Sequence, residues 1–118
     1  TEGLASGFGG PGLATSSAKD IITAFAGGGQ ASATQLAAMI NRITTVVTAA
    51  DSVKMPVSAA GLVIQVINAA AVNAVNVFPA TGEQINALGA NAAFSIPAGK
   101  SATFLTASAG QWHTVLSA

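Results

Sequence analysis

From residue 51 to the C-terminus, short apolar runs alternate with residues that favour turns. The apolar runs are about five to eight residues long. Glycines lie at or near the turns between them, at Gly61, Gly82, Gly89, Gly99 and Gly110. Runs of this length, bounded by Gly, Pro and Asn, are typical of β-strands. The pattern predicts an all-β fold, and we expect a small antiparallel β-sandwich or barrel of the jelly-roll kind.

Alternation within these runs predicts which side chains face the core. The run from Leu62 to Ile67 is almost continuously apolar, which predicts a strand buried on both faces. Val75 and Val77 fall on one side of the next strand. The inward positions expected further along the chain are Phe94, Ile96, Ala102, Phe104, Trp112 and Leu116.

Residues 32–47 fit two structures. Ser32 and Gln35 match a helix capping box. Five apolar residues then recur at helical spacing, namely Leu36, Met39, Ile40, Ile43 and Val47. Residues 43–48, however, are six consecutive β-branched residues, which suit a strand. We expect a strand from about Ile43 and leave the preceding segment open between helix and strand.

Glycine is concentrated at the N-terminus, where residues 1–29 hold eight of the thirteen glycines. This content predicts an extended glycine-rich arm over residues 1–29, followed by a β-rich body over residues 30–118. A solvated tail gains nothing from large apolar side chains. We therefore expect five arm residues to contact partner subunits, and deletion of residues 1–26 to leave the body folded. The five residues are Leu4, Phe8, Ile21, Ile22 and Phe25.

Charged residues are scarce, with four Lys and Arg against four Asp and Glu, 7% in total, compared with about 25% in typical domains. The zero net charge gives no electrostatic basis for binding nucleic acid or an anionic membrane, and we expect neither partner. The apolar stretch 59–80 is interrupted by Gly, Gln and Asn too often for a membrane span. A neutral surface also lacks self-repulsion, which favours association with copies of the chain or with a partner.

Candidate chemistry is sparse. His113 is the only histidine and there is no cysteine, so we expect no metal site and no cofactor. Residues 7–12 match the dinucleotide pattern G-x-G-x-x-G, but six residues before them leave no room for the strand that this motif needs. Asp51 and Glu83 lie beside turn residues, where we expect solvated carboxylates. We therefore expect a protein that is not an enzyme.

Aromatic residues suggest one alternative function. Trp112, with Phe78, Phe94 and Phe104, could form a platform on which a sugar stacks. Alternating aromatic positions are more typical of a core, and a pocket also needs convergent polar groups. The alternative to a purely structural role is that the protein is a carbohydrate-binding or receptor-binding module of a head or tail fibre.

Several segments from residue 27 onward resemble a module of small virion proteins of tailed bacteriophages. The segments include NRITTVVTAADSVKMP, GLVIQVINAAA, VNVFPATGEQINALG, AGKSATF and AGQWHTV. The blocks at residues 51–56 and 77–82 are the most distinctive in order and spacing. The resemblance implies a β-rich head decoration, or cement, protein that binds the major capsid protein. It also implies assembly in the host cytoplasm, a place on the outer surface of the capsid and, commonly, a homotrimer.

Overall fold

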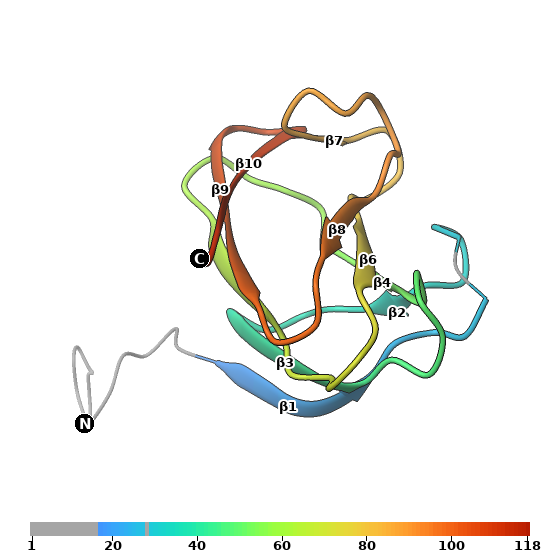
Figure 1. Cartoon of the computed structure of the whole chain (residues 1–118). Coiled ribbons are helices and arrows are strands. Elements are labelled where there is room, and N and C mark those ends of the chain that lie inside the picture. The colour runs from blue at the N-terminus through green and yellow to red at the C-terminus, as the bar shows by residue number, and fades with distance from the viewer. Residues whose placement is uncertain (1–16, 28) are drawn as a thin grey trace, which may run out of the picture.

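The computed structural model describes residues 17–27 and 29–118, and every regular element in these ranges is a β-strand (Figure 1). The all-β prediction is therefore confirmed. The strands are β1 (Ala18–Thr23), β2 (Thr34–Gln35), β3 (Ile40–Thr45), β4 (Ser52–Lys54), β5 (Val63–Asn68), β6 (Val75–Phe78), β7 (Gln84–Ile85), β8 (Phe94–Ile96), β9 (Ser101–Ser108) and β10 (Gln111–Leu116).

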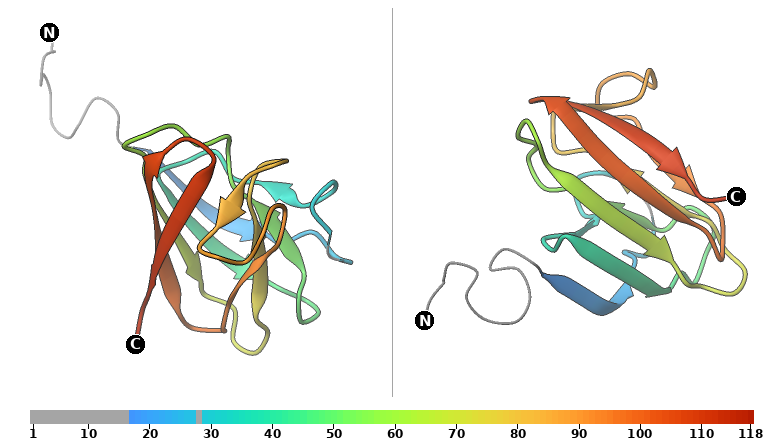
Figure 2. Two further views of the ribbon diagram at one scale, coloured as in Figure 1. Left: turned by 90° about the horizontal axis from the view of Figure 1, so that it is seen from above. Right: turned by 90° about the vertical axis from the view of Figure 1, so that its left-hand side faces the viewer.

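The strands form two sheets that enclose the core between them (Figures 1 and 2). One sheet has six strands in the order β1-β3-β5-β9-β10-β7, and the other has four in the order β2-β4-β6-β8. From β1 to β6 the chain changes sheet after every strand. Each odd-numbered strand of this part therefore lies in the six-stranded sheet, and each even-numbered strand lies in the four-stranded sheet.

This alternation produces three stacked coils. Each coil consists of one strand of the six-stranded sheet and the following strand of the four-stranded sheet. Coil 1 contains β1 and β2, coil 2 contains β3 and β4, and coil 3 contains β5 and β6. Neighbouring coils pair in parallel in both sheets. Ala18 pairs with Ile40, which pairs with Gln65, so equivalent positions recur after 22 and then 25 residues. The first two thirds of the described chain thus resembles a β-solenoid.

The expectation of an antiparallel sandwich or jelly roll is wrong for these three coils. Among the strands of the described chain, antiparallel pairing begins only after the coils, where β9 joins β5 and β10, and where β8 joins β6; within the coils it is limited to the single bridge between Phe25 and Ser52. The turn spacing located the strands but carried no information about their direction. A chain that crosses to the opposite sheet after each strand returns in its original direction, so its coils pair in parallel.

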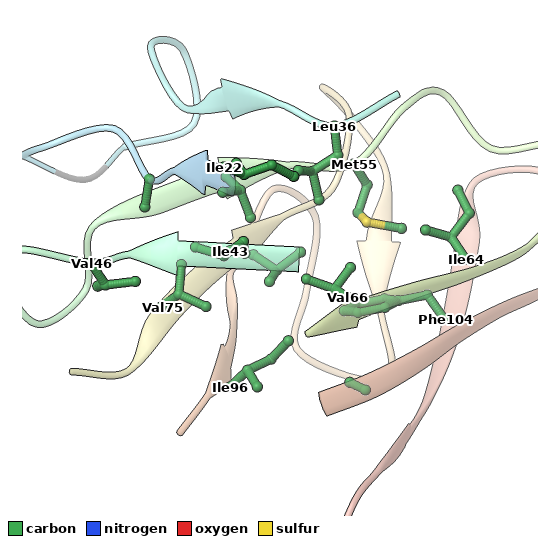
Figure 3. Packing of buried hydrophobic residues seen from close by; sticks show 14 of the residues in the cluster. Ile22, Leu36, Ile43, Val46, Met55, Ile64, Val66, Val75, Ile96 and Phe104 are labelled. Carbon is green, nitrogen blue, oxygen red and sulfur yellow. The ribbon is translucent and has the colours of Figure 1, made fainter. Parts of the chain in front are cut away.

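Parallel register places similar side chains one above another in the core (Figure 3). In the six-stranded sheet Ile22 pairs with Ile43, and both are buried. In the four-stranded sheet Val53 pairs with Val77, and neither is exposed to solvent. Val75 is also fully buried, which confirms the predicted inward side of that strand.

Two predictions of burial were wrong, and both concern the six-stranded sheet. In β5, Ile64 and Val66 are buried, but Val63 is 45% exposed, so this strand is buried on one face only. Leu116, at the end of β10, is 41% exposed. No other layer of the described chain covers the outer side of this sheet, which leaves an apolar strand face in contact with solvent.

The contested segment 32–47 is extended and holds two strands. The predicted strand near Ile43 is confirmed, although it begins earlier, at Ile40. Thr34 and Gln35 form β2, where the capping-box pattern suggested a helix as an alternative. Leu36 follows β2 and is buried in the same core as Ile43. Of the five apolar residues at helical spacing, only Leu36 and Ile43 are buried. Met39, Ile40 and Val47 are exposed, so the spacing did not mark one buried face.

The sheet begins inside the segment that the sequence assigned to the arm. β1 pairs with β3, and Ile22 of β1 is only 5% exposed. Deletion of residues 1–26 would remove this strand, so the expectation that the rest stays folded is no longer supported. The boundary was misplaced because glycine clusters lie on both sides of β1, at residues 7–12 and 27–29. Residues 1–16 lie outside the described residues.

Core packing gives a first prediction. Ile43→Ala removes a fully buried side chain from coil 2 and should lower the free energy of unfolding by about 2–5 kcal/mol. Chemical denaturation measures this change. Val57→Ala is the matched control, because Val57 is 74% exposed and its change should stay within about 0.5 kcal/mol. Equal losses for both variants would contradict the coil packing.

Candidate interaction surface

The uncovered side of the six-stranded sheet carries its side chains in cross-strand rows. Strand register gives three rows, which are Val63–Leu105–His113, Ile40–Gln65–Thr103–Val115 and Arg42–Ile67–Ser101. We call this surface the outer face. Its apolar members are Ile40, Val63, Ile67, Leu105 and Val115.

Exposure on the outer face is high for large apolar side chains. Val115 is 62% exposed, Ile40 is 47% exposed, and both lie in the middle row. They lie at opposite ends of this row, with the neutral polar residues Gln65 and Thr103 between them. Several exposed apolar side chains on one face are typical of protein interaction sites, whereas single exposed ones are ordinary. His113 is exposed at one end of the Val63 row.

The one full charge in these rows is paired. Arg42 Nη1 donates to Asp20 Oδ1 at 2.9 Å, from β3 to the neighbouring β1. This hydrogen bond, with a second from the Ile21 N–H to the same oxygen, holds the pKa of the Asp20 carboxyl below its ordinary value. The pair leaves the outer face electrically neutral.

Ile21 lies at the free edge of this sheet in an unusual conformation. Its φ is 55°, in the left-handed region that β-branched residues rarely adopt. The pairing of β1 with β3 is irregular between Lys19 and Ile22, and the Ile21 N–H bonds to Asp20 Oδ1 at 2.8 Å. The side chain is 74% exposed. Strain of this kind costs about 1–3 kcal/mol, and the exposed side chain gains no core packing in return.

The other predicted contact residues have three different locations. Phe25 is 40% exposed and exchanges two backbone hydrogen bonds with Ser52, so its position is fixed against coil 2. Ile22 belongs to the core, which makes its assignment to a partner contact wrong, because adjacent strand residues face opposite sides. Leu4 and Phe8 lie outside the described residues.

Asp51 and Glu83 are buried, so the expectation of solvated carboxylates is wrong. Asp51 accepts the N–H of Thr48 at 3.1 Å and that of Gly27 at 3.3 Å, which ties coil 1 to coil 2. Both Glu83 oxygens accept the Ser58 N–H, at 3.1 and 3.3 Å. A carboxylate beside a turn can accept hydrogen bonds from backbone N–H groups in place of water. Here these hydrogen bonds hold loops in position.

Trp112 is fully buried and cannot serve as an open stacking platform. It contacts Phe104 edge to face, with ring centroids 6.3 Å apart, and Phe104 contacts Phe94 in the same way at 5.8 Å. Trp112 and Phe104 therefore belong to the core and Phe94 to its margin, as the alternating pattern favoured, whereas Phe78 is partly exposed and outside this cluster.

Within residues 17–27 and 29–118, no three His, Asp or Glu side chains gather where they could hold a metal ion. The same part of the chain contains no helix that is long and apolar enough to cross a membrane. Comparison of the sequence with family models and with curated proteins gives no match, and comparison of the fold with solved structures gives none either.

The Asp20–Arg42 pair gives a pH prediction. A carboxyl whose pKa is lowered by folding adds stability above its unfolded pKa and loses that contribution as the pH falls through its folded pKa. Asp20→Asn keeps an acceptor for the Ile21 N–H but removes the charge. The free energy of unfolding of the original chain should exceed that of the variant near pH 7, and the difference should shrink as the pH falls below the ordinary range for an Asp carboxyl. A difference that stays constant with pH would contradict the role of the charge.

Proposed function

We propose that this protein is a structural virion protein that decorates and stabilises a bacteriophage capsid by binding the major capsid protein, without catalysis. The observation that carries the proposal is the neutral apolar outer face next to the strained, exposed Ile21. This surface suits contact with another protein. The likeness of residues 27–118 to small phage virion proteins supplies the identity of that partner.

Binding by this surface needs no charge. The apolar side chains of the outer face lose contact with water when a partner covers them, which yields about 25 cal/mol for each Å² of apolar area. Since one small interface must also offset the entropy lost on association, a decoration protein benefits from many copies and from contact with several subunits. A homotrimer on the outer surface of the capsid meets both needs, and we propose that arrangement.

The alternative function, a carbohydrate-binding or receptor-binding module, loses its proposed stacking residue because Trp112 is buried. A sugar site would have to use other residues, and the outer face presents no exposed aromatic ring in its rows. The decoration role is therefore the function that this surface supports better.

Ile21 provides a test that separates binding from folding. In Ile21→Asn the new side chain tolerates the left-handed backbone, so the free energy of unfolding should rise by up to about 1 kcal/mol. Binding to expanded capsids, measured by co-sedimentation, should weaken because the apolar contact is lost. Val57→Asn is the control, as Val57 is equally exposed at 74% but has no positive φ.

A variant that gained stability and bound capsids as tightly as the original chain would remove Ile21 from the proposed interface. Absence of capsid binding by the unaltered chain would overturn the proposed function as a whole.

The arm residues Leu4 and Phe8 require a separate binding test. Leu4→Ser with Phe8→Ser should leave the thermal midpoint of the body unchanged, within about 1 °C. It should lower capsid binding by about tenfold or more, since two apolar contacts of ordinary size are lost. Full binding by this variant would exclude these two side chains from the capsid contact.

A further inference from the structure

The two ends of the coil stack differ. At one end, β9 and β10 continue the six-stranded sheet beyond coil 3, and β8 does the same for the four-stranded sheet. At the other end, coil 1 is the last layer within the described residues, and β1 and β2 are both edge strands. Because an end without a further layer leaves core residues accessible, the coil 1 end is a place where another molecule can reach the core.

A cavity of about 470 Å³ opens at the coil 1 end, and we call it the coil 1 cavity. Its walls come from both sheets and include the core residues Ile22 of β1 and Leu36 just after β2 (Figure 3). The Thr34 hydroxyl joins the two walls by donating to the Thr23 carbonyl oxygen at 2.8 Å. The volume equals that of about fifteen water molecules, at about 30 Å³ each. It falls in the range of pockets that enclose a whole ligand, so more than one side chain is needed to fill it.

Asn41 marks one polar position in the coil 1 cavity. It lines the cavity and is fully buried. Its Nδ2 donates to the carbonyl oxygens of Ala38 at 2.9 Å and Gln65 at 3.3 Å, which fixes the orientation of the amide. Its Oδ1 accepts no hydrogen bond within the described chain. Since buried polar groups are almost always partnered, an occupant of the cavity should supply an N–H or O–H donor at this point.

The edge of β2 offers backbone hydrogen-bonding groups beside the cavity. The Leu36 N–H donates to the Lys54 carbonyl oxygen of β4 at 2.9 Å. Successive residues of a strand direct their backbone groups to opposite sides, so the N–H and C=O of Gln35 point away from β4, toward the free edge. The edge of β1 is less suited to pairing, because its backbone is irregular between Lys19 and Ile22. A strand that is added at this end would therefore pair with β2.

Lys19 gives the cavity a positive charge. It lines the cavity and pairs in register with Asn41. The side-chain carboxylates of the described residues are engaged elsewhere, because Asp20 is paired with Arg42 and the two buried carboxylates accept backbone N–H groups. Charge complementarity therefore favours an occupant that carries an acidic residue.

We propose that the coil 1 cavity binds an extended segment of a partner protein, which adds a strand to the free edge of β2. Alternate side chains of a strand point to the same side, so two of them enter the cavity together. One is a tyrosine or a tryptophan, which combines an apolar ring with the donor that Asn41 Oδ1 lacks. An acidic residue of the same segment lies near Lys19. This site is separate from the outer face, and the inference does not depend on capsid binding.

Titration of the full, isotopically labelled chain with a synthetic peptide tests the proposal by NMR spectroscopy. The peptide acetyl-Glu-Thr-Val-Thr-Tyr-Thr-amide places its Glu, Val and Tyr on one side of a strand. It should shift the backbone N–H signal of Gln35 and the side-chain amide signals of Asn41. The same peptide with Phe in place of Tyr should bind about fivefold more weakly, because it lacks the hydroxyl donor. Equal affinity of the two peptides would contradict the contact with Asn41.

Two substitutions of Gln35 separate strand addition from other modes of binding. Gln35→Pro removes the N–H at the free edge of β2, while the Leu36 N–H can still pair with β4. This variant should bind the Tyr peptide about tenfold more weakly or not at all. Gln35→Ala is the matched control, because it loses the same side-chain hydrogen bonds but keeps the N–H, and its affinity should match that of the original chain. Equal losses in both variants would overturn strand addition.

The location of the shifts decides between occupants. Absence of shifts at Gln35 and Asn41 in the original chain would overturn the proposal, and so would shifts confined to the outer face. Shifts at these two residues that appear without peptide, as the protein concentration rises, would also overturn it, because they would assign the cavity to a second copy. None of these measurements involves a capsid, so a failure of the proposed function would leave their results unchanged.

Discussion

In-register stacking of three parallel coils is the constraint on which the rest of this structure depends. Each coil contributes one strand to each sheet, so inward residues of one coil lie next to inward residues of the preceding coil, as Ile43 lies next to Ile22 and Val77 next to Val53. Parallel strands need a connection that returns the chain to its starting level, and here the opposite sheet supplies it. A core of modest side chains is thereby shared by both sheets.

This arrangement also explains where the molecule can bind. A two-sheet stack has an inside, two outer sides and two ends. The inside is filled, and buried carboxylates such as Asp51 tie the loops between coils. At the free edge strand β1, the Asp20–Arg42 pair and the irregular backbone at Ile21 disfavour the addition of a further strand. The surfaces that remain available for binding a partner are therefore the neutral outer face and the open coil 1 end.

Most strands after residue 51 could be predicted from the sequence, because β-branched and aromatic runs between turn glycines mark them clearly. Strand direction could not be predicted, since alternation of apolar residues is the same in parallel and antiparallel sheets. β1 was missed because Ile21 and Ile22 are adjacent and give no alternation. Asp51 and Glu83 were misplaced because a carboxylate beside a turn is accessible or buried according to which backbone donors the tertiary fold brings to it.

NMR spectroscopy of the isotopically labelled chain tests the parallel coil stack most directly, through the cross-strand contacts between β3 and β5. The account predicts nuclear Overhauser effects that join Ile40 to Gln65 and Ile43 to Asn68, with residue numbers rising together along the two strands. Contacts whose residue numbers run in opposite directions, or pairing of β3 with β4 in one sheet, would contradict it.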